Sequence, residues 1–343
     1  MAEHLGISPD PEFYVGLDEF DASNWEHFDA ERWEANIATY KTHLTRCWGE
    51  VPERISPNVV QLTESKEDGY TRFMFHMDVE NSGNEKWDSM SFFLLVPDTP
   101  ISDPAPLMVI HHQHAGKFDK GKEEPAGLMY DPEQALAVDL VKQGYITATH
   151  DALCFSERQE KDEFYTAMKL LMHGRTLNFK YCWDVSRLID HLQERPDVDP
   201  NRIGIIGHSL GGQEAIYCTV YDPRIKVAIS SCGVAKIGGT NSVFSENITH
   251  NKAFYVPGLW AGSLEMDMKE IVGLIHPRPL LMSHGIVDHI FPIEGVAEID
   301  NWIQELYSYY GNENKIVTLR HAGGHYIPHT TKDIIYKFLA SYL

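Results

Sequence analysis

Hydrophobic residues recur at three- and four-residue steps near the start of the chain, between residues 28 and 48. This spacing predicts an amphipathic helix that ends at Gly49. One face of the helix would carry the apolar residues Trp33, Ile37, Tyr40, Leu44 and Trp48. Such a stripe needs a partner, which is either the body of the same chain or a second subunit in a homodimer.

Apolar and polar positions alternate over residues 70–79 and 91–96, and the loop-forming segment 80–84 lies between them. This pattern predicts an antiparallel hairpin. Residues 107–110 are a continuous apolar run, which is typical of a strand buried on both faces. The remaining predicted elements are helix 131–143, strand 145–149, helix 164–192 with a break near Gly174, strand 202–206, helix 213–220, strand 225–230, strand 279–282, helix 296–309, strand 316–319 and helix 331–343.

This alternation of strands and helices predicts an α/β fold with a mostly parallel sheet flanked by helices. We expect an N-terminal helical extension over residues 1–69 and the main domain over residues 70–343. Residues 233–275 fit the alternation poorly, since they are rich in Gly, Ser, Asn and aromatic residues. We interpret them as a small insertion after the sixth strand that covers the active site, with a surface excursion as the alternative.

The formal net charge of −21 over 343 residues argues against nucleic acids and anionic membranes as partners. No apolar stretch reaches the roughly 18 residues that a membrane span needs. The five cysteines are scattered without a C-x-x-C, and the N-terminus shows no signal peptide. We therefore expect reduced thiols in a cytoplasmic protein.

A strand, a sharp turn and a helix are predicted in succession over residues 203–220. The turn reads Gly207-His-Ser-Leu-Gly211, a G-x-S-x-G sequence that places its serine at a strained corner. The glycines avoid clashes where the backbone reverses, and the helix N-terminus favours a nearby oxyanion. We predict that Ser209 is a catalytic nucleophile, the alternative being an ordinary glycine turn with a bystander serine.

A serine nucleophile needs a base, and the base needs an acid that orients it. With this kind of serine corner, the acid precedes the histidine along the chain. Asp288 follows the predicted strand 279–282 in a loop at the strand's carboxyl end, so we predict that it is the acid. Glu294 and Asp300 fall in a predicted helix and are weaker candidates.

The predicted base is His325, which follows strand 316–319 in a glycine turn, where its side chain can bend back over the sheet. Two other histidines compete for this role. His321 is too close to the strand end, and His329 adjoins the start of the final helix, where it can simply act as a cap.

An oxyanion formed at the serine needs two N–H donors. The first is predicted to be the backbone N–H of Leu210, and the second that of Gln113 or His114, of which we prefer His114. Both follow the strand 107–110 in the sequence His111-His-Gln-His114.

Three histidines in four residues also raise the alternative of a zinc site. His111 and His112 would point to opposite faces of a strand, and no nearby Asp, Glu or Cys has a suitable spacing. We therefore expect no metal. Residues bordering the substrate pocket are predicted to be His208, Phe155 from the loop 151–158, and Trp260 from the insertion.

Several motifs occur together over residues 70–343, in the order His112-Gln-His-Ala-Gly116, Arg195-Pro-Asp-Val-Asp-Pro-Asn-Arg-Ile203, Gly207-His-Ser-Leu-Gly-Gly212, His276-Pro-Arg-Pro-Leu-Leu281 with Asp288, and Gly323-Gly-His325. This part of the chain resembles an α/β-hydrolase of the dienelactone-hydrolase-like and acetyl-xylan-esterase-related branch. The resemblance implies an α/β-hydrolase fold and serine ester hydrolysis without a metal or organic cofactor. The chain departs from this branch at two positions. Dienelactone hydrolase itself resembles an enzyme with a cysteine nucleophile, whereas this chain has Ser209. The related deacetylases usually have Gln after the serine, whereas this chain has Leu210.

The leading hypothesis is a carboxylic-ester hydrolase with a Ser-Asp-His triad, an acyl-enzyme intermediate and a small ester substrate with a short acyl or acetyl group. A carbon–carbon bond hydrolase or a peptidase with the same triad is the second hypothesis, because one fold hosts several chemistries. The third is a catalytically silent binding protein on the same scaffold.

Overall fold

The computed structural model of the protein describes residues 14–129, 131–238 and 266–343. Its strands are β1 (Val60–Glu67), β2 (Tyr70–Asp78), β3 (Ser89–Pro97), β4 (Ala105–His111), β5 (Ile146–His150), β6 (Val198–His208), β7 (Ile225–Ser231), β8 (Leu280–Gly285) and β9 (Ile316–His321). They form one sheet in the order β1-β2-β3-β5-β4-β6-β7-β8-β9. Neighbours from β1 to β5 pair antiparallel, and those from β5 through β4 to β9 pair parallel.

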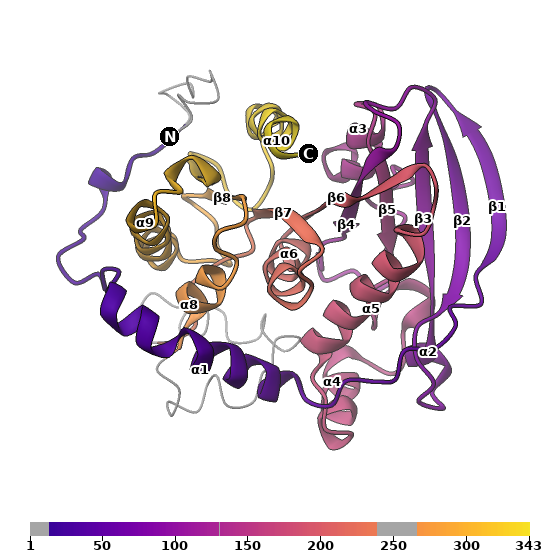
Figure 1. Ribbon diagram of the computed structural model, residues 1–343, viewed down its shortest axis with the longest axis horizontal. Helices are drawn as coiled ribbons and strands as arrows, with labels where there is room; N and C mark the ends of the chain where they lie inside the picture. Colours follow the sequence, from indigo (N-terminus) through magenta and orange to yellow (C-terminus); the bar gives the residue numbers. More distant parts are fainter. Residues whose placement is uncertain (1–13, 130, 239–265) are drawn as a thin grey trace.

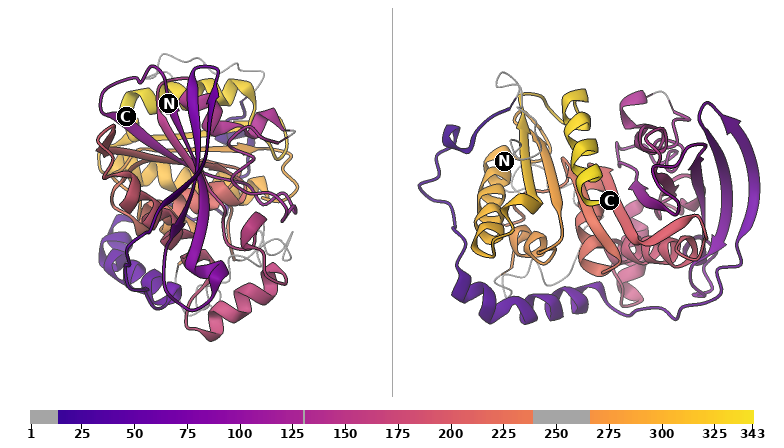
Figure 2. Two further views of the ribbon diagram at one scale, coloured as in Figure 1. Left: turned by 90° about the vertical axis from the view of Figure 1, so that its right-hand side faces the viewer. Right: turned by 45° about the horizontal axis from the view of Figure 1, so that its top comes forward.

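The sheet is strongly twisted, so that β1 and β2 cross the direction of the later strands (Figure 2, left). Helices cover both faces, and their bounds are α1 (Ala30–Trp48), α2 (Glu85–Asp88), α3 (Leu136–Val141), α4 (Glu163–Met172), α5 (Leu177–Leu192), α6 (Leu210–Tyr221), α8 (Met268–Gly273), α9 (Ile293–Tyr309) and α10 (His329–Tyr342). Helices α3 and α10 lie on one face, while α5, α6, α8 and α9 lie on the other (Figure 1). This is the fold of the α/β-hydrolases, as the alternation of elements predicts.

The continuous apolar run in β4 is explained by burial on both faces. Leu107 and Val109 belong to the core beneath α5 and α6, whereas Met108 and Ile110 belong to the core beneath α3 and α10. All four side chains are inaccessible to solvent. Each therefore contributes its full hydrophobic free energy, about 1.5–3 kcal/mol per side chain.

Helix α1 lies across the outer side of the layer formed by α5, α6, α8 and α9 (Figure 1). Its Trp33 packs edge-on against Trp302 of α9, with ring centroids 5.5 Å apart, and the Trp48 indole N–H donates to the Asn178 side chain at 2.8 Å. Gly273 of α8 allows the close approach, because a Cβ there would lie 2.8 Å from the Trp33 ring. The apolar stripe is thus covered by the chain itself.

The sheet starts earlier than the sequence indicates. Strand β1 pairs with β2, so residues 60–67, which we assigned to a helical extension, belong to the sheet. The predicted helix 131–143 is shorter than expected, since only Leu136–Val141 is α-helical after a short 3-10 turn at Pro132–Gln134. Most of the predicted insertion 233–275 lies outside the described residues, which resume at 266 and include α8.

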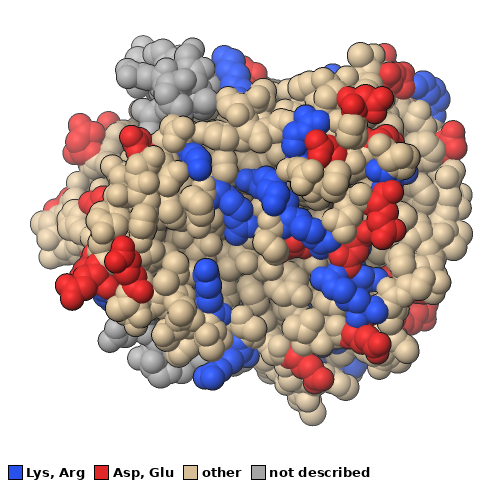
Figure 3. All heavy atoms as spheres, in the orientation of Figure 1, with Lys and Arg blue, Asp and Glu red and all other residues tan. Residues whose placement is uncertain are grey.

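The acidic net charge is unevenly distributed over the surface. On the face shown in Figure 3, lysine and arginine side chains run across the middle, and carboxylates lie mostly toward the edges. Among the described residues, no helix combines the length and apolar character that crossing a bilayer requires.

Candidate active site

Ser209 occupies the corner between β6 and α6, with φ 57° and ψ −119°. A non-glycine residue in this left-handed region is strained, and such strain often marks functional positions. The flanking glycines are required by space, because a Cβ on Gly207 would lie 2.3 Å from the Gly211 backbone and one on Gly211 would lie 2.1 Å from the His111 carbonyl oxygen. The local sequence therefore folds into the predicted serine corner.

Asp288 and His325 meet directly, although they lie 37 residues apart in the sequence. The Nδ1 atom of His325 is 2.7 Å from Oδ2 of Asp288. The other carboxylate oxygen accepts the backbone N–H groups of Ile290 at 2.8 Å and Phe291 at 3.3 Å. Burial pushes the pKa of Asp288 upward, but the His325 hydrogen bond and charge and these two N–H groups outweigh it, so the pKa falls below 3.8. The carboxylate stays ionised near neutral pH.

His208 connects this pair to the serine corner. Its ring lies against that of His325, with centroids 4.7 Å apart, and it is the residue immediately before Ser209. Its Nδ1 lies 3.1 Å from the Ser231 hydroxyl. His208 is 1% exposed, so it forms part of the floor under the site and not the border of the substrate pocket, where we predicted it.

The competing histidines lie in different surroundings. His321 is buried at the end of β9, and its Nδ1 is engaged by the Gly323 N–H at 3.2 Å. The His329 side chain is exposed and pairs with Glu133 at 2.9 Å. Of the weaker acid candidates, Asp300 is buried and pairs with Arg320. Within the described residues, His325 is the candidate histidine that forms a hydrogen bond with Asp288.

The predicted oxyanion donors lie on two adjoining elements. Leu210 is the first residue of α6, and Gln113 and His114 follow β4, which pairs with β6 up to His111 and Gly207. The Gln113 N–H donates to Glu124 at 3.3 Å, whereas His114 is fixed through Nε2, 3.1 Å from Glu163. The Gln113 N–H is therefore already engaged by a carboxylate oxygen.

Phe155 does not line an open pocket. It is fully buried and packs against His112, His114 and Phe118, with ring centroids 4.8 to 5.3 Å apart. It supports the loop that carries His114, which corrects its assignment to the pocket. Trp260, the third predicted pocket residue, lies outside the described residues.

His111 at the end of β4 and the following His112 and His114 do not converge as metal ligands. His112 accepts the Ala152 N–H at Nε2, so its Nδ1 carries the proton and donates to the Gln113 carbonyl oxygen. His111 Nδ1 is paired with the His112 carbonyl oxygen, and His114 with Glu163. In the part of the chain that the structure describes, the side chains whose ligand atoms are close enough to hold one metal ion do not include these histidines.

A layer of buried histidines lies under the site, which the sequence analysis missed. Strands β4, β5, β6 and β9 each end on a histidine, and β8 has one at its penultimate position; the five are His111, His150, His208, His284 and His321. Burial is the main cause that lowers their pKa values, to about 3 for His111, His208 and His284 and about 4 for His321. They are neutral at physiological pH. The signal was present in the sequence as a histidine one or two residues after each of these five apolar runs.

A second missed neighbour is Cys232, the residue after β7. Its Sγ, a carboxylate oxygen of Asp288 and a ring nitrogen of His325 all lie within 4.8 Å of one another. The thiol lies 3.9 Å from the Tyr326 carbonyl oxygen, to which it donates. Burial and the charge of Asp288 raise the thiol pKa, so the thiol is protonated and is not an alternative nucleophile.

Comparison with known proteins places this site in context. The chain is 28% identical over 310 residues to "Putative hydrolase YtaP" of Bacillus subtilis (strain 168), covering 89% of this chain and 99% of the relative. A glucuronoyl esterase from Solibacter usitatus has a similar fold, with a TM-score of 0.69 at 16% identity over 94% of this chain and 99% of that one. A protein of Bacteroides fragilis NCTC 9343 described as a "putative acetyl xylan esterase" also has a similar fold. Its TM-score is 0.65 at 14% identity, over 98% of this chain and 88% of that one.

The sequence model of the family described as "Glucuronyl esterase, fungi" matches residues 117–311. This range is more than half of the chain and includes Ser209 and Asp288. The chain is accordingly a carboxylic-ester hydrolase and belongs to the glucuronyl esterase family.

Proposed function

We propose that the chain hydrolyses esters of glucuronic acid with a catalytic triad of Ser209, Asp288 and His325. The observation that carries the proposal is the 2.7 Å bond between His325 Nδ1 and Asp288 Oδ2 beside the strained serine corner. Asp288 holds the Nδ1 proton of His325, which leaves Nε2 as the base. The substrate class is supported by the family match.

In this mechanism, Ser209 Oγ attacks the ester carbonyl carbon while His325 Nε2 takes its proton. The oxyanion accepts hydrogen bonds from the N–H groups of Leu210 and His114. His325 then donates the proton to the departing alcohol, and a glucuronoyl ester of Ser209 remains. A water molecule, deprotonated by His325, then attacks the acyl carbon; as the bond to Ser209 breaks, His325 returns the proton to Ser209 Oγ and glucuronate is released.

The neutral floor under the triad supports an uncharged ester as the substrate. The buried histidines beside the triad, His208, His284 and His321, have lowered pKa values and carry no charge near neutral pH. An ester carbonyl fits this environment, whereas the glucuronate product carries a negative charge close to ionised Asp288. Charge repulsion therefore favours product release over product inhibition.

The proposal is tested by measuring kcat/KM for methyl glucuronate, benzyl glucuronate and p-nitrophenyl acetate. We expect both glucuronate esters to be cleaved, and Ser209→Ala to lower kcat by about 10⁴-fold or more. Ser308→Ala, on the exposed surface of α9, is the matched control and should retain wild-type rates.

Cleavage of the acetyl ester without the glucuronate esters would reject the substrate class and favour an acetyl esterase. Turnover of none of these esters, together with fluorophosphonate labelling of Ser209, would favour a carbon–carbon bond hydrolase or a peptidase. Absence of labelling in the folded protein would favour a silent binding scaffold.

A further inference from the structure

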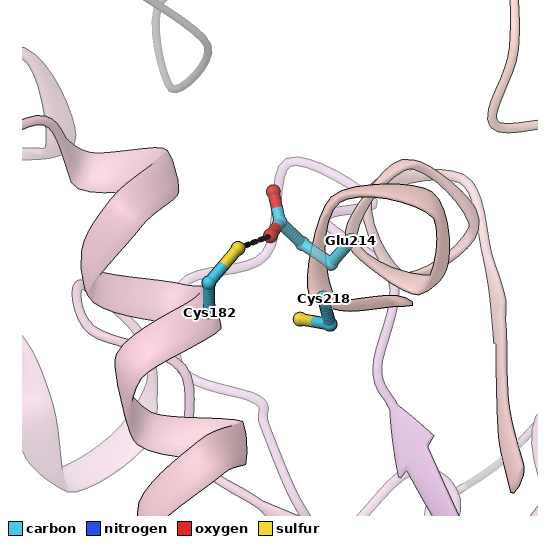
Figure 4. A group of neighbouring side chains, drawn as sticks. All are labelled: Cys182, Glu214 and Cys218. Carbon is cyan, nitrogen blue, oxygen red and sulfur yellow. Dashed lines mark hydrogen bonds between the residues drawn. The ribbon is translucent and has the colours of Figure 1, made fainter. Parts of the chain in front are cut away.

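The described residues contain two groups of three side chains whose ligand atoms are close enough to share one metal ion. The first group, Cys182, Glu214 and Cys218, lies between α5 and α6 and is fully buried (Figure 4). The second group is Cys232, Asp288 and His325. The two groups differ in charge and in access, and this difference decides which one suits a divalent cation.

In the first group, two thiolates and a carboxylate would place three negative charges on a divalent ion. One carboxylate oxygen of Glu214 accepts a hydrogen bond from the Asn178 side chain at 2.8 Å. The other accepts from the Cys182 thiol, whose Sγ lies 4.0 Å away (Figure 4). Burial raises the pKa of Glu214 well above its usual value, so a protonated, neutral carboxyl explains this group without an ion.

In the second group, one thiolate, one carboxylate and one neutral imidazole balance the charge of a divalent ion. Sulfur, nitrogen and oxygen donors of this kind are the ligands that Zn²⁺ prefers. Three protein ligands leave one tetrahedral position for water. The His325 side chain is 12% exposed, so the group has contact with solvent, unlike the first.

The backbone conformation of Cys232 fixes the position of its thiol. Cys232 has φ 46°, in the left-handed region that a residue with a Cβ rarely adopts. The conformation is held by two backbone contacts, since the Cys232 N–H donates to the Ser283 carbonyl oxygen at 2.7 Å and the Sγ contacts the Tyr326 carbonyl oxygen. This turn directs the thiol toward Asp288 and His325.

We propose that Cys232, Asp288 and His325 form a binding site for Zn²⁺ and that a bound ion inhibits the esterase. The inhibition rests on the proposed function, whereas the binding does not. When Nδ1 of His325 coordinates the ion, it must give up its proton, and the neutral ring then carries its proton on Nε2. That nitrogen can no longer accept the proton of Ser209.

The proton balance of this step is defined. The ion displaces the thiol proton of Cys232, the imidazole proton moves from Nδ1 to Nε2 by exchange with water, and one proton is released overall. Binding therefore strengthens about tenfold for each unit of rising pH while the thiol remains protonated in the free enzyme.

The test titrates Zn²⁺ into the esterase assay and, separately, titrates Co²⁺ while recording absorption of the thiolate-to-Co²⁺ charge-transfer band. Wild type should be inhibited by one equivalent of tightly bound Zn²⁺ and should show the Co²⁺ band. Cys232→Ser should weaken both by more than about 100-fold, since loss of a residue that merely supports a ligand already costs about 10- to 100-fold.

Cys218→Ser, in the first group, is the matched control and should behave as wild type, each variant being normalised to its own rate without metal. Loss of the Co²⁺ band in Cys218→Ser but not in Cys232→Ser would overturn the proposal, as would equal inhibition of wild type and Cys232→Ser. If the protein cleaves no ester, the Co²⁺ titration still decides the binding, and His325→Ala should then abolish the band.

Discussion

The two ends of the parallel strands carry opposite kinds of polar chemistry. At the carboxyl ends lie Ser209, the Asp288–His325 pair and a layer of buried, neutral histidines. At the amino ends, arginines form fixed ion pairs, and Asp190 accepts from Arg54, Arg187 and Arg224 in one cluster. Residues of this cluster line a cavity of about 690 Å³ at the opposite end of the strands from Ser209.

The difference shows where each end places its charge. Ion pairs at the amino ends hold the connections between α5, β7 and the segment before β1 without taking part in chemistry. The carboxyl ends also hold a cation, Arg320, but the buried carboxylate of Asp300 pairs with it. The histidines around the triad are uncharged near neutral pH because burial lowers their pKa values. Variants at the carboxyl ends should therefore change activity, and variants at the amino ends should change stability.

The largest expected effect is that of His325→Ala. Loss of the base should lower kcat for a glucuronate ester by about 10⁴-fold or more. The free energy of unfolding should change far less, by about 1 kcal/mol, because the side chain lies at the edge of the core. Steady-state kinetics and urea unfolding of the same preparation check both parts, and an equal loss of folding and activity would break the comparison.

The next effect is acid sensitivity at the carboxyl ends. The pKa values of His284 and His321 are lowered, chiefly by burial, to about 3 and about 4 in the folded state, against 6.5 for an unperturbed histidine. The unfolded chain therefore takes up more protons, and stability is lost as the pH falls below about 6.5. Each such histidine should cost about 1.4 kcal/mol per pH unit between pH 6 and 4.

Urea unfolding at pH 7, 6 and 5 measures this slope, and His284→Gln should reduce it by one histidine's share. The ion pairs at the amino ends should not contribute in that range. Hydrogen bonding to Arg202 lowers the pKa of Asp199 below 3.8, so this pair is lost only in stronger acid. The raised pKa of Asp300, about 6 because of burial, acts in the opposite direction over pH 6 to 4. The decisive comparison is therefore between wild type and His284→Gln, and an identical slope in the two proteins would contradict the neutral-histidine floor.

A smaller effect is expected for Arg224→Ala at the amino ends. Arg224 donates to Asp222 at 2.6 and 2.9 Å and to Asp190 at 2.7 Å, and Asp222 is 3% exposed. Removing the arginine leaves a buried carboxylate without its partner and should cost about 2 kcal/mol of stability. Thermal unfolding tests this, and a parallel loss of kcat would show that the two ends are not independent.

The smallest effect should come from Arg195→Ala. Arg195 pairs with Asp197 at 2.7 Å, but both side chains are partly exposed. Pairs of this kind contribute about 0.2–1 kcal/mol, so the melting temperature should hardly change. A large loss would mean that this pair belongs to the cluster around Asp190.

Much of the fold and the core of the site follow from local patterns. Strand–turn–helix spacing locates Ser209, and the rule that ligands gather at the carboxyl ends of parallel strands brings Asp288 and His325 to the same edge. What the sequence did not indicate depends on lateral order in the sheet. Cys232 meets Asp288 because β7 pairs with β8, and no short-range pattern encodes that pairing.

Burial was the second source of error. Strand β1 is exposed along nearly its whole length, so it shows no apolar alternation and was placed in the helical extension. Phe155 follows a strand at the functional edge, as pocket residues do, yet three aromatic neighbours enclose it. Position along the chain predicts which edge a residue reaches but not the depth at which it lies.

The contact between Trp33 and Trp302 has a consequence for biosynthesis. Helix α1 leaves the ribosome early, whereas α8 and α9, against which it packs, are among the last elements to be made. The tryptophan side chains of the nascent N-terminal segment therefore stay exposed to solvent until nearly the entire chain has been synthesised. Premature termination before α9 would leave this tryptophan-rich segment exposed, and exposed hydrophobic segments are bound by chaperones and cleaved by proteases.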